Sequence, residues 1–257
     1  MSFEHNTLLK VAVIGAGVSG LSVASLLGAA GHKVHVFEKS RKISELGAGI
    51  QISPNGFRVL KKLGVAEDTI NNSVRNNSIL ICDYYKGKKL LQFDQSSSLE
   101  NKHFRLMHRA DLIKILYQSA LSNKVAFKLG DAVDAQSLSS QYSFVIAADG
   151  VHSKTRALVN PMQNKNRRSD YFVWRSIVPN KTSHHNGVRL TVAPNKHIVS
   201  YPLRGLDQLN LVLIQEAENN EIFEWDLAES PKEIKRLFSE FGGDLSEALH
   251  SIETVHK

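Results

Sequence analysis

Val11-Ala-Val-Ile-Gly-Ala-Gly-Val-Ser-Gly20 is the stretch from which the fold of this chain can be argued. A short apolar run leads directly into Gly15, Gly17 and Gly20, and a segment of good helix formers follows at once. This order predicts a strand, a tight turn and a helix start. In such a unit the first glycine permits the turn, the second lets a pyrophosphate approach the backbone, and the third lets helix and strand pack closely. The alternative is that these glycines serve chain packing alone.

The next predicted strand supports a dinucleotide site. Residues 32–38 are typical of a strand and end on Glu38, whose carboxylate is placed to accept hydrogen bonds from a ribose diol. Free amides at the N-terminus of the intervening helix would face the phosphates. Two further glycines, Gly47 and Gly49, follow in a loop and imply that the backbone there runs close to another group, such as a ligand.

Composition sets the broad class. With 257 residues the chain is long enough for one large or two modest domains, and 42% hydrophobic with 22% charged residues is ordinary for a soluble globular protein. No stretch approaches the roughly 18 apolar residues of a membrane span, and the N-terminus does not have the pattern of a signal peptide. A single cysteine, Cys82, excludes an internal disulfide and a cysteine-rich metal site. We therefore expect a cytoplasmic protein.

The formal net charge of +7 is compatible with several classes of ligand, and the distribution of the basic residues helps to choose among them. The lysines are scattered, and no basic stripe alternates with aromatic residues, which disfavours nucleic-acid binding. A moderately basic surface that attracts a nucleotide and an acidic substrate is a better interpretation than nucleic-acid binding, and a lysine-rich genome explains the charge better still. The adjacent His184 and His185 lie in a polar loop without ligand spacing to other residues, so no metal is predicted.

The rest of the chain alternates between two kinds of structure. Segments 78–85 and 88–93 predict a β-hairpin around Lys86-Gly87. A helix is then expected from Arg109, a strand over 125–129, and a buried strand over 143–148 that leads into Asp149-Gly150. From Asp170 onward four segments read as strands (171–178, 188–192, 198–203 and 209–214), and helices are expected over 231–241 and 244–252.

This order predicts an α/β fold in which two domains are interleaved. A Rossmann-like dinucleotide-binding domain would comprise residues 1–75 and 102–160. Residues 76–101 and 168–257 would form a mostly antiparallel β-sheet domain. We find no internal repeat and no low-complexity segment.

Three patches of sequence, in this order and spacing, carry a family resemblance. They are the glycine stretch with Glu38, then Arg109 at a helix start, and then Asp149-Gly150 followed by Ser153 and Arg156. Together they resemble the FAD-dependent aromatic hydroxylases, flavoprotein monooxygenases of the para-hydroxybenzoate hydroxylase type. Segments 47–55, 173–175 and 197–205 look most like the salicylate and 3-hydroxybenzoate hydroxylase branch.

The resemblance implies a function and a cofactor. The family hydroxylates aromatic acids with FAD as cofactor, NAD(P)H as co-substrate and O₂. The expected partner is thus a small, salicylate-like aromatic acid, with no nucleic acid and no integral membrane. The oligomeric state is left open, as are the particular ring and the choice between NADH and NADPH.

Site residues follow from the resemblance by position. Glu38 would hold the adenosine ribose, and Arg109 would lie along the FAD diphosphate and ribityl chain. Asp149, with Gly150, would serve both FAD and the nicotinamide cofactor, and Arg156 would support their loop. The cofactor-binding set is completed by Gly15, Gly17, Gly20 and Gly49.

His197 and Tyr201 fall where the branch places residues that contact the substrate ring, and His197 is a candidate general base. Their separation of four residues puts both on one face of a strand.

Each assignment has a structural alternative. Arg109 could form an ion pair with Asp111 at the helix start, and Asp149 could cap the turn before Ser153. A lone histidine such as His197 is more often a surface or core residue than a base.

One departure from the family pattern concerns the C-terminal part. The family carries a Gly-Asp motif, which binds the ribityl chain, and a helical region that closes the active site; neither is found before Lys257. We therefore expect a truncated monooxygenase with weakened FAD binding. The alternative is a non-catalytic remnant that keeps part of a dinucleotide pocket as a binding or interaction protein. An NAD-dependent dehydrogenase would require the Arg109 and Asp149 patches to be coincidental.

Overall fold

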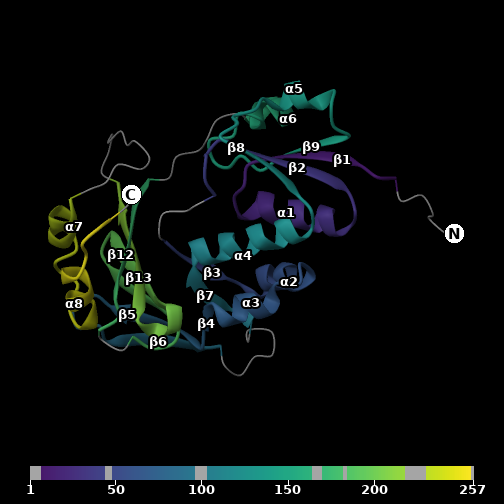
Figure 1. Cartoon of the computed structure of the whole chain (residues 1–257). Coiled ribbons are helices and arrows are strands. Elements are labelled where there is room, and N and C mark those ends of the chain that lie inside the picture. Colours follow the sequence, from purple (N-terminus) through teal and green to yellow (C-terminus); the bar gives the residue numbers. More distant parts are fainter. Residues whose placement is uncertain are drawn as a thin grey trace. The chain divides into compact units, whose positions relative to one another are not determined.

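The computed structural model describes residues 7–43, 48–95, 103–163, 170–181, 184–217 and 230–255. Contacts divide the chain into two compact units (Figure 1). The first comprises Met1–Glu45, Lys61–Val65 and Leu112–Arg167, and the second comprises Leu46–Leu60, Ala66–Asp111 and Arg168–Lys257. Gly47 and residues 96–101 lie outside the described residues.

The first unit contains a four-stranded parallel sheet. Its order is β8 (Ala126–Leu129), β2 (Lys33–Glu38), β1 (Lys10–Ile14) and β9 (Phe144–Ala147). Val11, Ala12 and Val13 of β1 are almost completely buried, as expected for a central parallel strand that is covered on both faces. The predicted Rossmann-like core is therefore confirmed.

The helices of this unit include α1 (Val18–Ala29), the larger part of α4 (Arg109–Ser122), α5 (Ala135–Ser139) and α6 (Arg156–Val159). The short 3-10 helix η2 (Pro161–Gln163) follows α6. Helix α1 packs closely against the end of α4. The hydroxyls of Ser25 and Ser119 lie 2.7 Å apart, and the Asn123 side-chain amide donates to Ser25 Oγ at 3.0 Å. A Cβ atom on Gly28 would lie only 2.6 Å from the Asn123 carbonyl oxygen, so only glycine permits this approach.

Strand β9 corrects one prediction. The segment over 143–148 does form a strand, but the expectation that it is buried is wrong, because the Phe144 side chain is 59% exposed. In the described part of the chain β9 pairs with β1 alone and is an edge of the sheet. The apolar composition of a segment indicates that it favours a strand, but it does not indicate whether other parts of the chain cover that strand.

The second unit contains a six-stranded sheet. Its order is β10 (Tyr171–Pro179), β13 (Gln208–Glu216), β12 (Lys196–Leu203), β11 (Val188–Ala193), β5 (Ser78–Asp83) and β6 (Lys89–Asp94). All pairs are antiparallel except β11 with β5. The predicted hairpin, β5 with β6, is confirmed and joins strands that follow about 100 residues later, so the predicted mostly antiparallel second sheet is confirmed as well.

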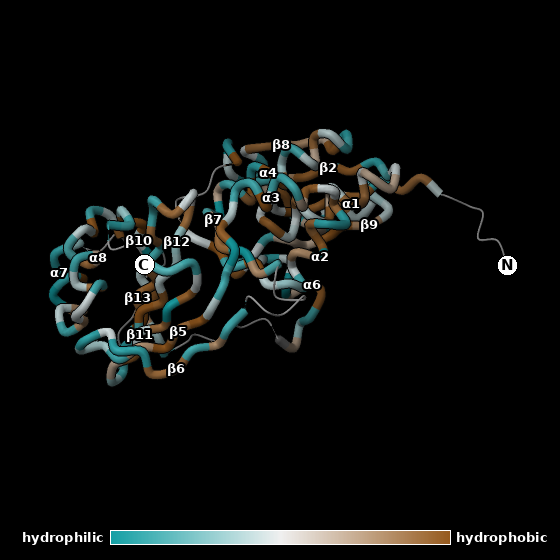
Figure 2. Tube along the Cα trace, turned by 90° about the horizontal axis from the view of Figure 1, so that it is seen from below, coloured by the Kyte–Doolittle hydropathy of each residue, from teal (hydrophilic) through white to brown (hydrophobic). Residues whose placement is uncertain are grey.

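Helices α7 (Pro231–Leu237) and α8 (Asp244–His250) cover one face of this sheet. Trp174, Leu211 and Leu213 pack there against Ile234 and Phe238. Figure 2 shows the corresponding contrast, with hydrophobic residues along the strands and a largely hydrophilic α7. The alternation of buried and half-buried residues along β10 shows that its second face is not covered in the same way.

A smaller sheet in the second unit was not foreseen as a separate element. It contains β3 (Gly49–Ile52), β7 (Arg105–His108) and β4 (Ser73–Arg75), in that order. Helices α2 (Pro54–Lys62) and α3 (Ala66–Asn71) follow β3 in the chain. The 3-10 helix η3 (Arg204–Leu206) follows β12 of the larger sheet. Leu106 of β7 packs against Tyr201 and Leu203 of β12. None of the helices in the described residues is both long and apolar enough to cross a membrane.

Candidate functional site

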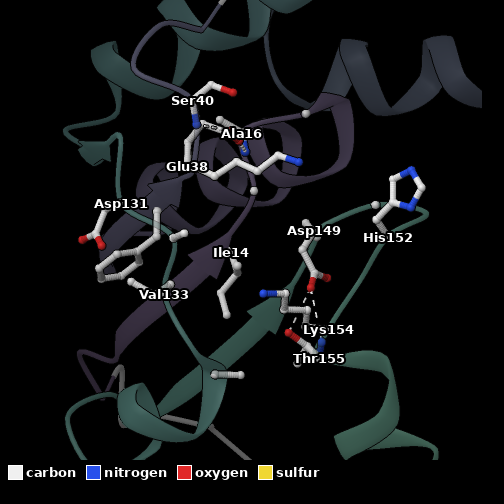
Figure 3. Close-up of a pocket in the computed structure, with 18 of the residues that line it drawn as sticks. Ile14, Ala16, Glu38, Ser40, Asp131, Val133, Asp149, His152, Lys154 and Thr155 are labelled. Carbon is white, nitrogen blue, oxygen red and sulfur yellow. Dashed lines mark hydrogen bonds between the residues drawn. The ribbon is translucent and has the colours of Figure 1, made fainter. Parts of the chain in front are cut away.

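A cavity of about 740 Å³ lies in the first unit, at the carboxyl ends of its parallel strands (Figure 3). Ile14 ends β1, Glu38 ends β2, and Ala148 directly follows β9; all three line the cavity. The carboxyl edge of a parallel sheet is where α/β proteins place their ligands. Of the residues predicted from the sequence, Gly15, Gly17, Glu38, Asp149 and Gly150 line this cavity.

The three glycines have different neighbours. Gly15 has a φ of +101°, and a Cβ atom there would collide with the carbonyl oxygen of Ala148. A Cβ atom on Gly20 would collide with the carbonyl oxygen of Gly15. At Gly17 a Cβ atom would meet no described atom within 4 Å. Packing therefore accounts for Gly15 and Gly20, whereas Gly17 borders open space in the cavity.

We predict that Gly20→Ala destabilises the fold. The new methyl group would press on a backbone carbonyl, and overpacking of this kind costs about 1–3 kcal/mol or more. The gain in helix propensity, about 1 kcal/mol, offsets only part of this. Urea denaturation should show a net loss of about 1–2 kcal/mol, and an unchanged midpoint would contradict the packing argument. Gly31→Ala is a less suitable control because Gly31 has a φ of +87°; Ser19→Ala serves better.

The N-terminus of α1 supplies donors to the cavity. Gly17 is the N-cap residue, its backbone is extended, and no side chain caps the helix there. The Gly17 carbonyl accepts from Leu21 N at 2.9 Å, so the amides of the first turn have no acceptor within the helix. Such amides, with the positive end of the helix dipole, bind phosphate groups.

Glu38 is held in a fixed orientation by two backbone amides. Its Oε2 accepts from Ala16 N at 2.8 Å and its Oε1 from Ser40 N at 2.9 Å. A carboxylate oxygen has a second lone pair, so both oxygens retain the capacity to accept a hydroxyl. Glu38 thus connects the glycine turn with the end of β2. Because its ionised carboxylate can only accept hydrogen bonds, it suits the two hydroxyls of a ribose diol.

Asp149 is organised by the turn that follows it. Thr155 donates to Asp149 Oδ2 from its amide at 3.3 Å and from its hydroxyl at 3.1 Å (Figure 3). Burial raises the pKa of Asp149, but hydrogen bonds from Ser153 and Thr155 outweigh it and lower the pKa overall. The capping role considered from the sequence is therefore present in the structure, and Asp149 lines the cavity as well.

Arg156 stabilises the same loop from behind. Its guanidinium donates to the carbonyl oxygens of Val151 at 2.9 Å and Gly150 at 3.4 Å. Its own amide donates to Ser153 Oγ at 3.0 Å. Gly150 has a φ of +78°, a conformation that favours glycine. Arg156 and Gly20 thus support the wall of the cavity instead of lining it.

An Asp149→Asn variant should lose stability in a pH-dependent way. Because the folded state lowers the pKa of Asp149, the ionised carboxylate stabilises the fold above its unfolded pKa, near 3.8, and this contribution is lost as pH falls through the lower folded value. We expect a loss of about 1 kcal/mol at pH 7, narrowing below pH 3.8. Denaturation at several pH values tests this, with Asp170→Asn as an exposed control. A gap that stays constant with pH would contradict it.

Sequence analysis missed one wall of the cavity. Residues 131–135, which follow β8, line it and are held there because Asp131 N donates to the Glu38 carbonyl at 3.0 Å. Lys39, Lys42 and Lys154 also line the cavity, together with the carboxylates of Glu38, Asp131, Asp134 and Asp149, so the lining carries charges of both signs. No local motif marks this wall; only the position of β8 beside β2 in a parallel sheet could have indicated it.

The remaining predicted residues, Gly49, Arg109, His197 and Tyr201, belong to the second unit. Gly49 N donates to Asn210 Oδ1 at 2.6 Å, and a Cβ atom on Gly49 would lie 2.7 Å from the Tyr201 ring and hydroxyl. The group close to the Gly49 backbone is therefore part of the protein. Asn210 was missed, although a polar residue within Leu209-Asn-Leu-Val-Leu is a detectable break in an apolar strand. Arg109 begins α4, and its amide donates to the Ala48 carbonyl at 2.9 Å.

His197 and Tyr201 lie on one face of β12, as predicted. His197 is half-buried, and burial lowers its pKa, so the imidazole is neutral at pH 7 and able to accept a proton. Burial raises the pKa of Tyr201, and Arg175 opposes this in part. The Tyr201 phenol therefore stays protonated at neutral pH. Within the described residues no group of three or more His, Cys, Asp or Glu side chains is arranged to hold a metal ion.

Comparison with known proteins agrees with this geometry. Residues 8–248 match the family described as FAD binding domain. The 3-amino-4-hydroxybenzoate 2-monooxygenase of Streptomyces cremeus is 34% identical over 77% of this chain and 54% of its own length. The 3-hydroxybenzoate 6-hydroxylase of Klebsiella oxytoca is 27% identical over 88% of this chain and 61% of its own length. This chain thus spans between about half and two thirds of these relatives.

Solved structures share the fold. Klebsiella pneumoniae HpxO, complexed with FAD and uric acid, superposes with a TM-score of 0.79 at 20% identity, over 99% of this chain and 68% of that one. CtdE, in complex with FAD and its substrate 4, gives a TM-score of 0.80 at 16% identity, over 96% of this chain and 68% of that one.

Proposed function

The chain belongs to the FAD binding domain family, and from that premise we propose that it binds FAD and an aromatic acid as part of an NAD(P)H-dependent monooxygenase. The open side of Gly17, in a cavity where Glu38 is fixed by two amides, is the observation that carries the proposal. The donors present fit the ADP half of FAD. The amides of α1 would take the diphosphate, and Glu38 would take the adenosine ribose.

The other predicted residues have proposed roles around the same cofactor. Arg109 would lie along the diphosphate and ribityl region, and the loop of Asp149 and Gly150, supported by Arg156, would serve FAD and the nicotinamide co-substrate. Bound FAD would supply the chemistry of O₂ activation, which no side chain can perform. Residues 1–75 and 102–160 are the proposed FAD-binding domain, and 76–101 and 168–257 are the proposed substrate domain.

The substrate-side residues of this chain would move a proton. His197, neutral at pH 7, would accept the phenolic proton of the aromatic acid and make the ring more electron-rich. Tyr201, buried and protonated, would donate a hydrogen bond beside it. The names of the relatives indicate hydroxybenzoate-type acids. Since Cys82 is the single cysteine and is buried, a reducing compartment, the cytoplasm, is the proposed location.

Titration with FAD tests the proposal. The purified chain should quench flavin fluorescence on binding, and addition of 3-hydroxybenzoate with NADH or NADPH should produce a dihydroxylated acid. A protein that acquires no flavin spectrum at millimolar FAD would overturn the proposal. FAD binding without any product would favour the non-catalytic alternative.

A further inference from the structure

Three rows of side chains cross the six-stranded sheet on the face opposite α7 and α8. Residues directly paired across neighbouring strands share a face. In register, the first row is Val173, Ile214, His197 and Val192; the second is Arg175, Val212, Val199 and Leu190; and the third is Ile177, Asn210 and Tyr201. The residues between them in the chain, such as Trp174 and Leu211, pack under the two helices.

The middle of this face is apolar. Val199 and Val212, which we call the valine floor, lie side by side between the row of His197 and the row of Tyr201. Leu106 packs over the end of the face at Tyr201, whereas Arg175, Val212 and His197 are half-buried. This surface therefore offers a partly open apolar floor with polar groups at its margins.

Arg175 has no acidic residue beside it in the second row or in the neighbouring positions of the other two rows. The first row continues from Val192 to Asp83, but Asp83 lies on β5, four strands from Arg175. The ion pairs of Arg189 with Asp244, 3.2 Å, and of Lys196 with Glu240, 3.4 Å, are made by residues of the helix-covered face. The positive charge of Arg175 lowers the pKa of Tyr201 in part against the effect of burial, and register places Arg175 one row and two strands from Tyr201 on this face. A half-buried cation over apolar side chains is stabilised by an anion that binds it.

We propose that Arg175 binds the carboxylate of the aromatic acid, so that the ring lies on the valine floor between His197 and Tyr201. The planar guanidinium matches a carboxylate with two parallel hydrogen bonds. His197 lies two strands from Arg175, about 10 Å across the sheet, and one row, about 7 Å, along it. A ring held at its carboxylate by Arg175 thus extends toward His197. The inference rests on the proposed function for its substrate class and assigns the residue that selects an acid.

The test compares two ligands of similar shape. Calorimetry would measure binding of 3-hydroxybenzoate and of the uncharged 3-hydroxybenzyl alcohol to the full chain and to Arg175→Gln. We expect the variant to bind the acid about 10–100-fold more weakly and the alcohol within about twofold of the wild type. Arg175→Lys should recover part of the affinity. Arg189→Gln, on the opposite face, is the matched control and should bind both ligands like the wild type.

The inference would be overturned if Arg175→Gln kept its affinity for the acid, or if the wild type did not prefer the acid to the alcohol. It would also be overturned if Arg175→Gln lost affinity for the acid and the alcohol equally while circular dichroism showed an intact fold. FAD titration of the same preparations separates the two proposals. If the chain binds FAD and Arg175→Gln still binds the acid, only this inference fails. If acid binding depends on Arg175 but no FAD binds, only the proposed function fails.

Discussion

A Gly17→Asp variant is expected to bind FAD at least about 100-fold more weakly while unfolding no more easily than the wild type. FAD affinity and fold stability should change in opposite directions, because affinity depends on the cavity that Gly17 borders, whereas stability depends on the capping of α1. The backbone of Gly17 is extended, and a side chain there would meet no described atom within 4 Å. Aspartate is a preferred N-cap residue and favours the positive end of a helix, so stability should be equal or up to about 1 kcal/mol higher.

The loss of affinity has a different cause. The new carboxylate would stand where the diphosphate is proposed to bind, and like charges brought together cost several kcal/mol; about 2.7 kcal/mol corresponds to 100-fold. Calorimetric titration with FAD and with ADP measures the effect. Gly17→Ala, which adds volume without charge, should lose less, about tenfold. Undiminished FAD affinity of Gly17→Asp would place the diphosphate elsewhere.

His197→Gln is expected to lower kcat of the FAD-loaded protein by about 100-fold or more, with a smaller effect on KM. Glutamine keeps the size and a hydrogen-bonding end but cannot take up a proton, and a positioned base contributes about 10²–10⁴-fold. Burial lowers the pKa of His197 below 6.5. The wild-type rate should therefore persist down to a pH below 6.5 and then fall as the imidazole becomes protonated.

Turnover of a hydroxybenzoate followed across pH 5–9 tests this. The acidic limb should be present in the wild type and absent in His197→Gln. His250→Gln is the control, since His250 lies on α8, is exposed and donates from Nδ1 to the Ser246 carbonyl at 2.6 Å. A variant at His197 that keeps most of kcat, or an acidic limb centred above pH 6.5, would remove His197 from the role of base.

Strand pairing and burial could be predicted from the sequence only where they depend on neighbouring residues. The hairpin of β5 and β6 was predictable because its turn and alternation are local. The pairing of β5 with β11 joins Ile79 with Val188, and nothing near either residue specifies the other. The burial predicted for β9 failed for the same reason, since exposure of Phe144 depends on whether another segment covers it.

Local sequence was enough to predict the strand, turn and helix over residues 11–29, the acid at the end of β2 and the family resemblance, because turn chemistry and apolar periodicity act over a few residues. Which glycine borders open space and which is packed against other atoms depends on contacts between segments that are distant in the chain. Gly15 meets Ala148, and Gly49 meets Asn210, across more than 130 positions of the chain. The tertiary structure also places Arg175 in register between the rows of His197 and Tyr201. Such contacts are set by strand order and register, which depend on the packing of the whole sheet and not on any single segment.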